Sequence, residues 1–424
     1  MKFRKVSALL LAGAMCAATV VGCGKTSSTS GTSSNDATKA AEDEEITATI
    51  TVWGPAEDQS IDNGEWLQNM CKKFNDEHPK WNLTFKYGTC SEKDAGSTVS
   101  ADPSASADVY MYANDQLQTL IDAGAISKLG GSALETVKKN NSEAMLKTVT
   151  IGDDVYGVPF TGNTWFLFYN KDIFTADDVK NLDTMLSKGK VSFKLTDSWY
   201  IGGFYIGNGC TVFGADGTDE SAGIDLTGDK ATDVTKYLVD LAANPNFVND
   251  ADSAGITGFN DGTVGAFFSG TWDMSNIKLD KSKVGVVAAP TYTLNGKENQ
   301  MTAFAGSKAI GVNPNCKYPQ VAVALALYLG SDDAQVSRYE ARGIIPCNIG
   351  AVSNDKVAAD EMAVAQNDTM NNKSVMQPTC KGMSNWWTPA ENMGKSIIAG
   401  ETTKDNAADK TAEFNEGANN GIVK

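Results

Sequence analysis

Alternating and periodic apolar positions divide the chain into short strands and amphipathic helices. Residues 46–53, ITATITVW, alternate apolar side chains with threonine and predict a first strand. Residues 65–77 carry apolar side chains at helical spacing and predict a helix ended by Pro79, and residues 83–87 predict the next strand. A strand, helix and strand of these lengths form a βαβ unit, so the pattern predicts the α/β fold class with a parallel sheet.

Residues 107–113 predict a third strand and residues 115–123 a short helix. Asn114 and Asp115 therefore fall at the carboxyl end of a strand, where open α/β sheets bind ligands. Asp115 also suits the N-cap of the helix, and the two roles are compatible. Further strands are expected at 191–195, within 259–277, at 284–290 and at 308–312, further helices at 197–205, 234–243, 318–329, 331–342, 390–399 and 404–417, and a solvated loop or hairpin at 214–233.

Residues 156–171, YGVPFTGNTWFLFYNK, predict a strand that leaves one compact lobe and enters another. Gly157 and Pro159 disfavour a helix at its start, and residues 164–169 are apolar, aromatic and β-rich. Between these halves, the small polar residues 161–164 suit a backbone bend between two lobes. On this stretch alone, an ordinary core strand with a polar kink is the alternative.

The N-terminus predicts export. Three basic residues precede an apolar run over residues 6–21, which indicates a signal peptide over residues 1–22. Residues 20–23, VVGC, resemble the bacterial lipobox, in which the cysteine, here Cys23, is lipidated and becomes the mature N-terminus; a plain signal peptide with an incidental cysteine is the alternative. Residues 23–45 are rich in Ser, Thr and Gly and predict a flexible tether. Because no later run reaches the length of a membrane span, we expect a soluble body held at the membrane by lipid.

Length and charge narrow the choice of partners. The 424 residues, 42% of them hydrophobic, suggest two domain-sized units behind the tether. Without the signal the chain has 33 basic and 52 acidic residues, a net charge of −19. Such an acidic chain argues against nucleic acid or anionic lipid as partners.

Six cysteines lie outside the signal and the lipobox, and export permits disulfides. Their positions along the predicted elements suggest local pairs between Cys71 and Cys90 and between Cys316 and Cys347. With His78 as the one histidine, the chain disfavours a zinc site.

Catalytic signatures are missing from the sequence. It holds no Gly-x-Ser-x-Gly elbow, no phosphate-binding loop and no complete Gly-x-Gly-x-x-Gly motif, so we expect no cofactor and no enzyme activity. The acidic residues 214–233 lack the spacing of a calcium loop. Carboxylate pairs leave glycoside hydrolysis open, because a sequence does not measure the separation of two acids.

Tryptophan recurs at strand ends or beside Gly and Pro. Each of these residues could be an ordinary core residue, but six are hard to explain in that way. A sugar presents apolar C–H faces and hydroxyl edges, so flat aromatic platforms beside Asp, Asn and Glu predict a carbohydrate site. The six are Trp53, Trp165, Trp199, Trp272, Trp386 and Trp387.

Six motifs in order make the chain resemble the extracellular solute-binding proteins of ABC sugar importers, and among them the maltose and maltodextrin-binding proteins. The likeness covers nearly all of residues 46–424. The motifs are ITVW at 50–53, ADV with AND at 107–115, GVP with YNK at 157–171, FNDG at 259–262, GTW with SNI at 270–277, and MS with WW at 383–387.

The resemblance implies a type II periplasmic-binding-protein-like fold, in which hinge strands join two lobes and a ligand cleft lies between them. It implies that Asp115 binds sugar hydroxyls, that Trp272 and Trp387 are stacking platforms, and that Asp197 and Trp199 lie in the cleft. Further candidate ligand-binding residues are Asn163, Glu57, Asp58 and Trp386.

The chain also departs from the maltose binders. Gln116 replaces an arginine, Asn163 replaces a glutamate, and Glu57-Asp58 replaces an acid followed by lysine. The family assignment is therefore firmer than the identity of the sugar.

These observations predict a lipid-anchored, monomeric, sugar-binding subunit of an ABC importer, with an α-glucan oligosaccharide such as maltodextrin as ligand and membrane permease subunits as partners. A binder of a different oligosaccharide and a surface glycoside hydrolase are the alternatives. The N-terminal lobe is expected to combine residues 46–161 with 303–350, and the C-terminal lobe 162–302 with 351–424.

Overall fold

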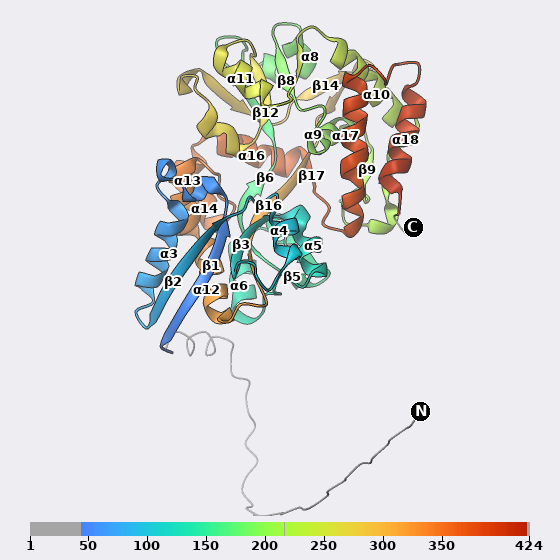
Figure 1. Cartoon of the computed structure of the whole chain (residues 1–424). Helices are drawn as coiled ribbons and strands as arrows, with labels where there is room; N and C mark the ends of the chain where they lie inside the picture. The colour runs from blue at the N-terminus through green and yellow to red at the C-terminus, as the bar shows by residue number, and fades with distance from the viewer. Residues whose placement is uncertain (1–43, 216, 422–424) are drawn as a thin grey trace, which may run out of the picture.

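The computed structural model describes residues 44–215 and 217–421, which form two α/β lobes (Figure 1). The predicted export signal, with Cys23, lies outside the described residues. Figure 1 shows the first lobe below, around β1, β2 and β3, and the second above, around β8 and β12, with β6, β16 and β17 between them. Among the described residues, no helix is long and apolar enough to cross a membrane.

The first lobe is built on a sheet in which β1, β2 and β3 run parallel, and this confirms the predicted βαβ unit. Along the sheet the order is β17-β16-β3-β1-β2, with β6 paired to β16. The alternating apolar side chains of β1 are buried and pack with those of α3 and α12 in one core. The strands are β1 (Ile46–Gly54), β2 (Trp81–Thr89), β3 (Val109–Ala113), β6 (Val158–Asn163), β16 (Ala303–Val312) and β17 (Ser374–Met376), and the main helices α3 (Trp66–Glu77), α4 (Ala95–Ala101), α5 (Leu117–Asp122), α6 (Gly131–Asn140), α12 (Pro319–Leu329) and α13 (Asp332–Arg342).

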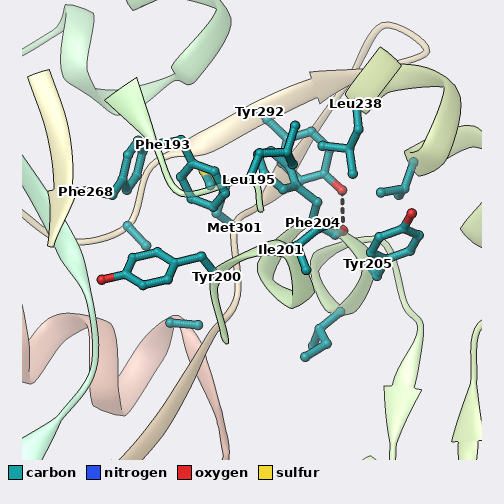
Figure 2. Close-up of a cluster of buried hydrophobic side chains, with 14 of the residues drawn as sticks. Phe193, Leu195, Tyr200, Ile201, Phe204, Tyr205, Leu238, Phe268, Tyr292 and Met301 are labelled. Carbon is teal, nitrogen blue, oxygen red and sulfur yellow. Dashed lines mark hydrogen bonds between the residues drawn. The ribbon is translucent and has the colours of Figure 1, made fainter. Parts of the chain in front are cut away.

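The second lobe contains a sheet of order β11-β8-β12-β7-β13. Its core is strongly aromatic (Figure 2), and the Tyr292 hydroxyl donates a hydrogen bond of 2.7 Å to the Phe204 carbonyl. The strands are β7 (Phe166–Asn170), β8 (Val191–Phe193), β11 (Phe247–Asn249), β12 (Ala266–Ser269) and β13 (Val284–Val287), and the main helices α8 (Leu182–Leu186), α9 (Ser198–Gly207), α10 (Gly228–Ala243), α11 (Ala254–Asp261), α16 (Glu361–Asn372), α17 (Ser384–Ile398) and α18 (Ala407–Asn419).

The predicted crossing strand is confirmed. β6 pairs with β16 in the first sheet, and β7, three residues later in the chain, pairs with β12 and β13 in the second. β16 is a second connection between the lobes. The chain leaves β13 of the second sheet, forms a hairpin over residues 291–300, and then enters the first sheet as β16, which pairs with β6 and β3. β17 runs parallel to the start of β16, so residues 374–376 join the edge of the first sheet.

Three local predictions were wrong or incomplete. Residues 383–387 were expected before a helix, but α17 begins at Ser384 and continues through Pro389. α10 begins at Gly228, inside the expected loop. The β14–β15 hairpin (Thr291–Leu294 and Lys297–Gln300) was not predicted, although Asn295-Gly296, both with positive φ, is a strong two-residue hairpin signal.

The predicted disulfides are wrong, because all six cysteines among the described residues are free thiols. Cys71 is buried on α3, where loss of hydration raises the pKa of its thiol to about 12 despite a hydrogen bond with Tyr87. The Cys316 sulfur accepts a hydrogen bond from the Tyr318 backbone N–H at 3.4 Å, and Cys347 contacts Asn141. Cys71, Cys90, Cys210 and Cys316 therefore serve as small buried side chains, and Cys347 and Cys380 are partly buried.

Candidate ligand-binding site

In the first lobe, Asp115 lies where the end of β3 meets the crossing strand β16. It belongs to a 3-10 turn, Asn114–Gln116, that follows β3 directly. Asn114 is wholly buried and its side-chain oxygen accepts a hydrogen bond from the Ser307 backbone N–H at 3.1 Å, which fixes the turn to β16. Gln116, which replaces the arginine of the maltose binders, donates a hydrogen bond of 3.0 Å to the Asp115 carboxylate. Asp115 itself is half-buried.

In the second lobe, Asp197 and Trp199 lie at the start of α9. The Asp197 carboxylate caps the helix by accepting a hydrogen bond from the Trp199 backbone N–H at 2.8 Å. Asp197 is exposed and Trp199 is half-buried, so both side chains keep accessible surface.

One lysine links the two carboxylates electrostatically. Loss of hydration raises the pKa of both Asp115 and Asp197, and in each case the positive charge of Lys93 opposes that rise. The two carboxylates, Asp115 of the first lobe and Asp197 of the second, thus have one charged neighbour in common, the exposed Lys93.

An aromatic pair completes this surface. The rings of Trp199 and Trp272 have centroids 6.1 Å apart at an interplanar angle of 49°. Trp272 follows β12 in a 3-10 turn, Thr271–Asn276, and folds back over Gly270, where a Cβ would lie 2.2 Å from the ring. Trp272 and Trp199 both remain half-buried, although Trp199 also packs against the core of the second lobe, so the pair offers apolar surface.

Trp386 and Trp387 are adjacent on α17, but their side chains lie on different faces of the helix. Trp387 is half-buried and its ring lies 6.5 Å from that of Phe304, whereas Trp386 has no exposed surface. The Trp386 ring N–H donates a hydrogen bond of 2.8 Å to the Ser198 carbonyl, and the ring packs on Phe414. Trp386 is therefore placed in the core and not with the other candidates, and the same holds for Trp165, which is wholly buried.

Asp58 is also placed in the interior. Its two oxygens accept hydrogen bonds from Arg338 at 3.0 and 2.9 Å, and Arg342 pairs with it as well. Asp58 has no exposed surface, so its carboxylate offers nothing to a ligand in this structure. The neighbouring Glu57 is exposed on α2 (Ala56–Gln59), and Asn163 is half-buried at the end of β6, opposite Gly306.

Three residues near the site were missed. The charge of Lys93 acts on both carboxylates, Lys308 places its ammonium 5.8 Å from the centre of the Trp272 ring, and Gln377 accepts a hydrogen bond from the Trp199 ring N–H at 2.7 Å. Lys308 did give a signal in the sequence, because it is the one charged residue in the strand AFAGSKAIGV. Lys93 and Gln377 gave none.

The two lobes also touch through charged side chains. Lys381, in the 3-10 turn before α17, lies 3.9 Å from Asp122 on α5 of the first lobe. Both side chains are at least half exposed, so the pair stabilises the arrangement little. Among the residues described by the structure, no group of three or more His, Cys, Asp or Glu side chains is arranged to hold a metal ion.

Two α/β lobes joined by strands, with partly exposed aromatic and carboxylate side chains at the ends of strands and the starts of helices, have the architecture of a two-lobed binding protein. The chain belongs to the bacterial extracellular solute-binding family, whose model matches residues 69–365. This confirms the family expected from the motifs and indicates a location outside the cytoplasm.

Similar proteins support the same fold. A solved structure with acarbose is 50% identical, with a TM-score of 0.86, and the match covers 89% of this chain and all of that one. The maltodextrin-binding protein MdxE of Bacillus subtilis (strain 168) is 27% identical over 71% of this chain and 78% of its own. The galactooligosaccharide-binding protein of the same bacterium is 24% identical over 73% of this chain and 76% of its own.

Proposed function

We propose that this protein captures an oligosaccharide between its lobes, with an α-glucan such as maltodextrin as the expected ligand, and delivers it to the permease of an ABC importer. The observation that carries the proposal is the half-exposed pair of Trp199 and Trp272, with the carboxylate of Asp197 bonded to the Trp199 backbone at the start of α9. The names of the similar proteins, which refer to maltodextrin, a galactooligosaccharide and acarbose, support an oligosaccharide as the class of ligand.

The chemistry of the site suits a sugar. An indole ring packs against the apolar C–H face of a pyranose, while Asp115 and Asp197 accept hydrogen bonds from hydroxyl groups at its edge. Trp387 supplies a further platform, and Asn163 and Glu57 supply polar groups at the rim. A ligand that touches both lobes favours the closed arrangement by the contacts that closure adds. The protein then presents its closed form to the permease as a monomer.

The anchor is part of this proposal. Cys23 carries the lipid, and the tether behind it lets the body reach the permease. Changing Cys23 to Ser should release the protein into the medium, as measured by fractionation of cells and medium. Retention of the variant in the membrane fraction would argue against lipidation at Cys23.

Two other activities are kept as rivals. The galactooligosaccharide-binding relative makes a different oligosaccharide, such as a galactooligosaccharide, the second candidate ligand. A surface glycoside hydrolase is the third possibility, and it should release reducing ends from a malto-oligosaccharide that a binding protein returns unchanged.

Thermal unfolding with a panel of sugars tests the proposal. A ligand that binds only the native state raises the melting temperature by mass action, and the rise increases with the ratio of ligand concentration to Kd. We expect maltotriose or longer α-glucans to raise it and a galactooligosaccharide to do so less. A matched panel on Trp272→Ala separates binding at this site from general effects of sugar. If no oligosaccharide stabilises the wild-type protein, the proposed function is wrong.

A further inference from the structure

Each ring of the aromatic pair contacts a side chain from the strands that join the lobes. Lys308, which contacts Trp272, is part of β16, and Gln377, which contacts Trp199, comes directly after β17. β16 and β17 pair in parallel at their starts, and the Gln377 backbone N–H donates to the Ala305 carbonyl at 2.7 Å. Both contacts therefore originate from one two-stranded connection.

Gln377 is held rigidly. It is 2% exposed, and its side-chain oxygen accepts the hydrogen bond from the Trp199 ring N–H. An indole has a single N–H donor, so this bond fixes the rotation of the ring. Trp199 itself is half-buried, and its orientation is thus set from the interior by a residue of the connection.

Lys308 is held by charge. Its ammonium lies 3.5 Å from the carboxylate of Glu92, and the side chain is 22% exposed. Glu92 lies 3.5 Å from Arg338, which in turn pairs with the buried Asp58. Burial alone would raise the pKa of Glu92, but Lys308 and Arg338 hold it below its ordinary value, so Glu92 keeps its charge.

The position of the ammonium therefore depends on the buried charges behind it, and the same ammonium faces Trp272 on its other side. In the sheet, Lys308 pairs with Ala113, two residues before Asp115. A cation at this distance from a ring is attracted to its face, more strongly where water is partly excluded.

We propose that Lys308 and Gln377 are positioning residues that fix the rings of Trp272 and Trp199 to the strands joining the lobes. The geometry of the aromatic pair then follows any movement of β16 and β17. A ligand that stacks on the rings selects the arrangement of the strands that holds them, which links occupancy to the relative position of the lobes. The effect on affinity rests on the proposed function, whereas the geometry of the pair does not.

The chain offers a matched control. Lys194 lies 5.8 Å from the ring of Tyr200, pairs with Asp250 at 3.6 Å and is 24% exposed, which closely reproduces the surroundings of Lys308. It lies between β8 and α9, away from the connecting strands. Lys194→Met thus removes a similar cation from a similar place without removing a contact made to either indole, and its route to the pair is indirect, through the Tyr200 ring, which lies 5.4 Å from that of Trp199.

The first measurement needs no ligand. Two indoles this close couple their electronic transitions, and the couplet in the far-ultraviolet circular dichroism is assigned by its loss in Trp272→Phe. We expect Lys308→Met and Gln377→Leu to reduce the couplet, and Lys308→Arg and Lys194→Met to keep it. An unchanged couplet in Lys308→Met, or an equal fall in Lys194→Met, overturns the role of Lys308. An unchanged couplet in Gln377→Leu overturns that of Gln377.

The second measurement is calorimetric titration with maltotetraose. Lys308→Met should weaken binding about three- to tenfold, with Lys308→Arg near the wild type. If the wild-type protein binds no sugar, the proposed function fails while the couplet still decides the positioning roles. If Lys308→Met loses the couplet and binds as tightly as the wild type, the link between the pair and affinity is wrong.

Discussion

The interior of the lobes and the surfaces that face each other use the same residue types for different purposes. Trp386 and Trp387 are adjacent in the chain, yet one is wholly buried and the other half-exposed. Asp58 and Asp115 both follow strands of the first sheet, yet their partners differ. Asp58 is enclosed by two arginines, whereas Asp115 accepts a hydrogen bond from the side-chain amide of Gln116 and has the charge of Lys93 at a greater distance. What distinguishes the site from the core is therefore the set of partners around a side chain.

The largest expected contrast is between the two neighbouring tryptophans. Trp386→Ala removes a wholly buried ring and a hydrogen bond, so it should lower the free energy of unfolding by about 3 to 5 kcal/mol. Trp387→Ala should lower it much less and should instead weaken oligosaccharide binding. Denaturant unfolding and calorimetric titration of both variants measure the two effects. Equal losses of stability would mean that Trp387 is a core residue after all.

The two aspartates should differ almost as much. Asp58→Asn removes the buried carboxylate that Arg338 and Arg342 share and leaves Glu92, 3.5 Å from Arg338, as the remaining acid of the cluster; breaking such a cluster should cost about 3 to 5 kcal/mol in unfolding free energy. Asp115→Asn, whose carboxylate has no cation in direct contact, should leave stability within about 1 kcal/mol of the wild type. Urea unfolding of the two variants decides this, and a stable Asp58→Asn protein would contradict the structural role assigned to the cluster.

Part of the division between core residues and candidate site residues could be predicted from the sequence. The alternation of β1 predicted its buried face, and the polar residues between two apolar halves predicted the crossing from β6 to β7. Motif order then identified Asp115 and Trp272 as candidates for the site. The predictions of the strand and of the crossing succeeded because periodicity and local composition reflect burial directly, whereas the roles of Asp115 and Trp272 in ligand binding stay predictions.

The failures arise where burial depends on distant partners. The arginine that encloses Asp58 is 280 positions further along the chain, so no local pattern could reveal the pair. A helix was expected to begin at residue 390, but α17 begins at Ser384, contains Pro389 and includes the buried Trp386. In a helix, adjacent side chains point about 100° apart, so a shift of the start changes which tryptophan is exposed.

Within the site, the stacking residue should matter more than the acid. An indole buries about 150 to 250 Å², so losing the platform in Trp272→Ala should weaken maltodextrin binding by about 2 to 4 kcal/mol. Asp115→Ala leaves sugar hydroxyls unpaired and should weaken binding by about 1 to 3 kcal/mol. Calorimetric titration beside melting curves of the ligand-free variants measures both. Unchanged affinity with a collapsed melting temperature in Trp272→Ala would mean that the ring belongs to the core.

The smallest expected effect is a difference in how stability depends on pH. Loss of hydration raises the pKa of Asp115 above its ordinary 3.8, so in the range just above 3.8 the folded state binds more protons than the unfolded state. The stability of the wild type relative to Asp115→Asn should therefore fall as pH rises through that range.

Asp178 provides the opposite case, because its hydrogen bond with Lys188 lowers its pKa to about 2. The stability that the wild type gains from Asp178, relative to Asp178→Asn, should be fully present above pH 3.8 and should be lost as pH falls toward 2. Urea unfolding of the three proteins across a pH series measures both slopes. Slopes of the same sign would contradict the environment assigned to Asp115, since a carboxylate that has lost water without gaining a cation in direct contact is protonated more readily in the folded state than in the unfolded one.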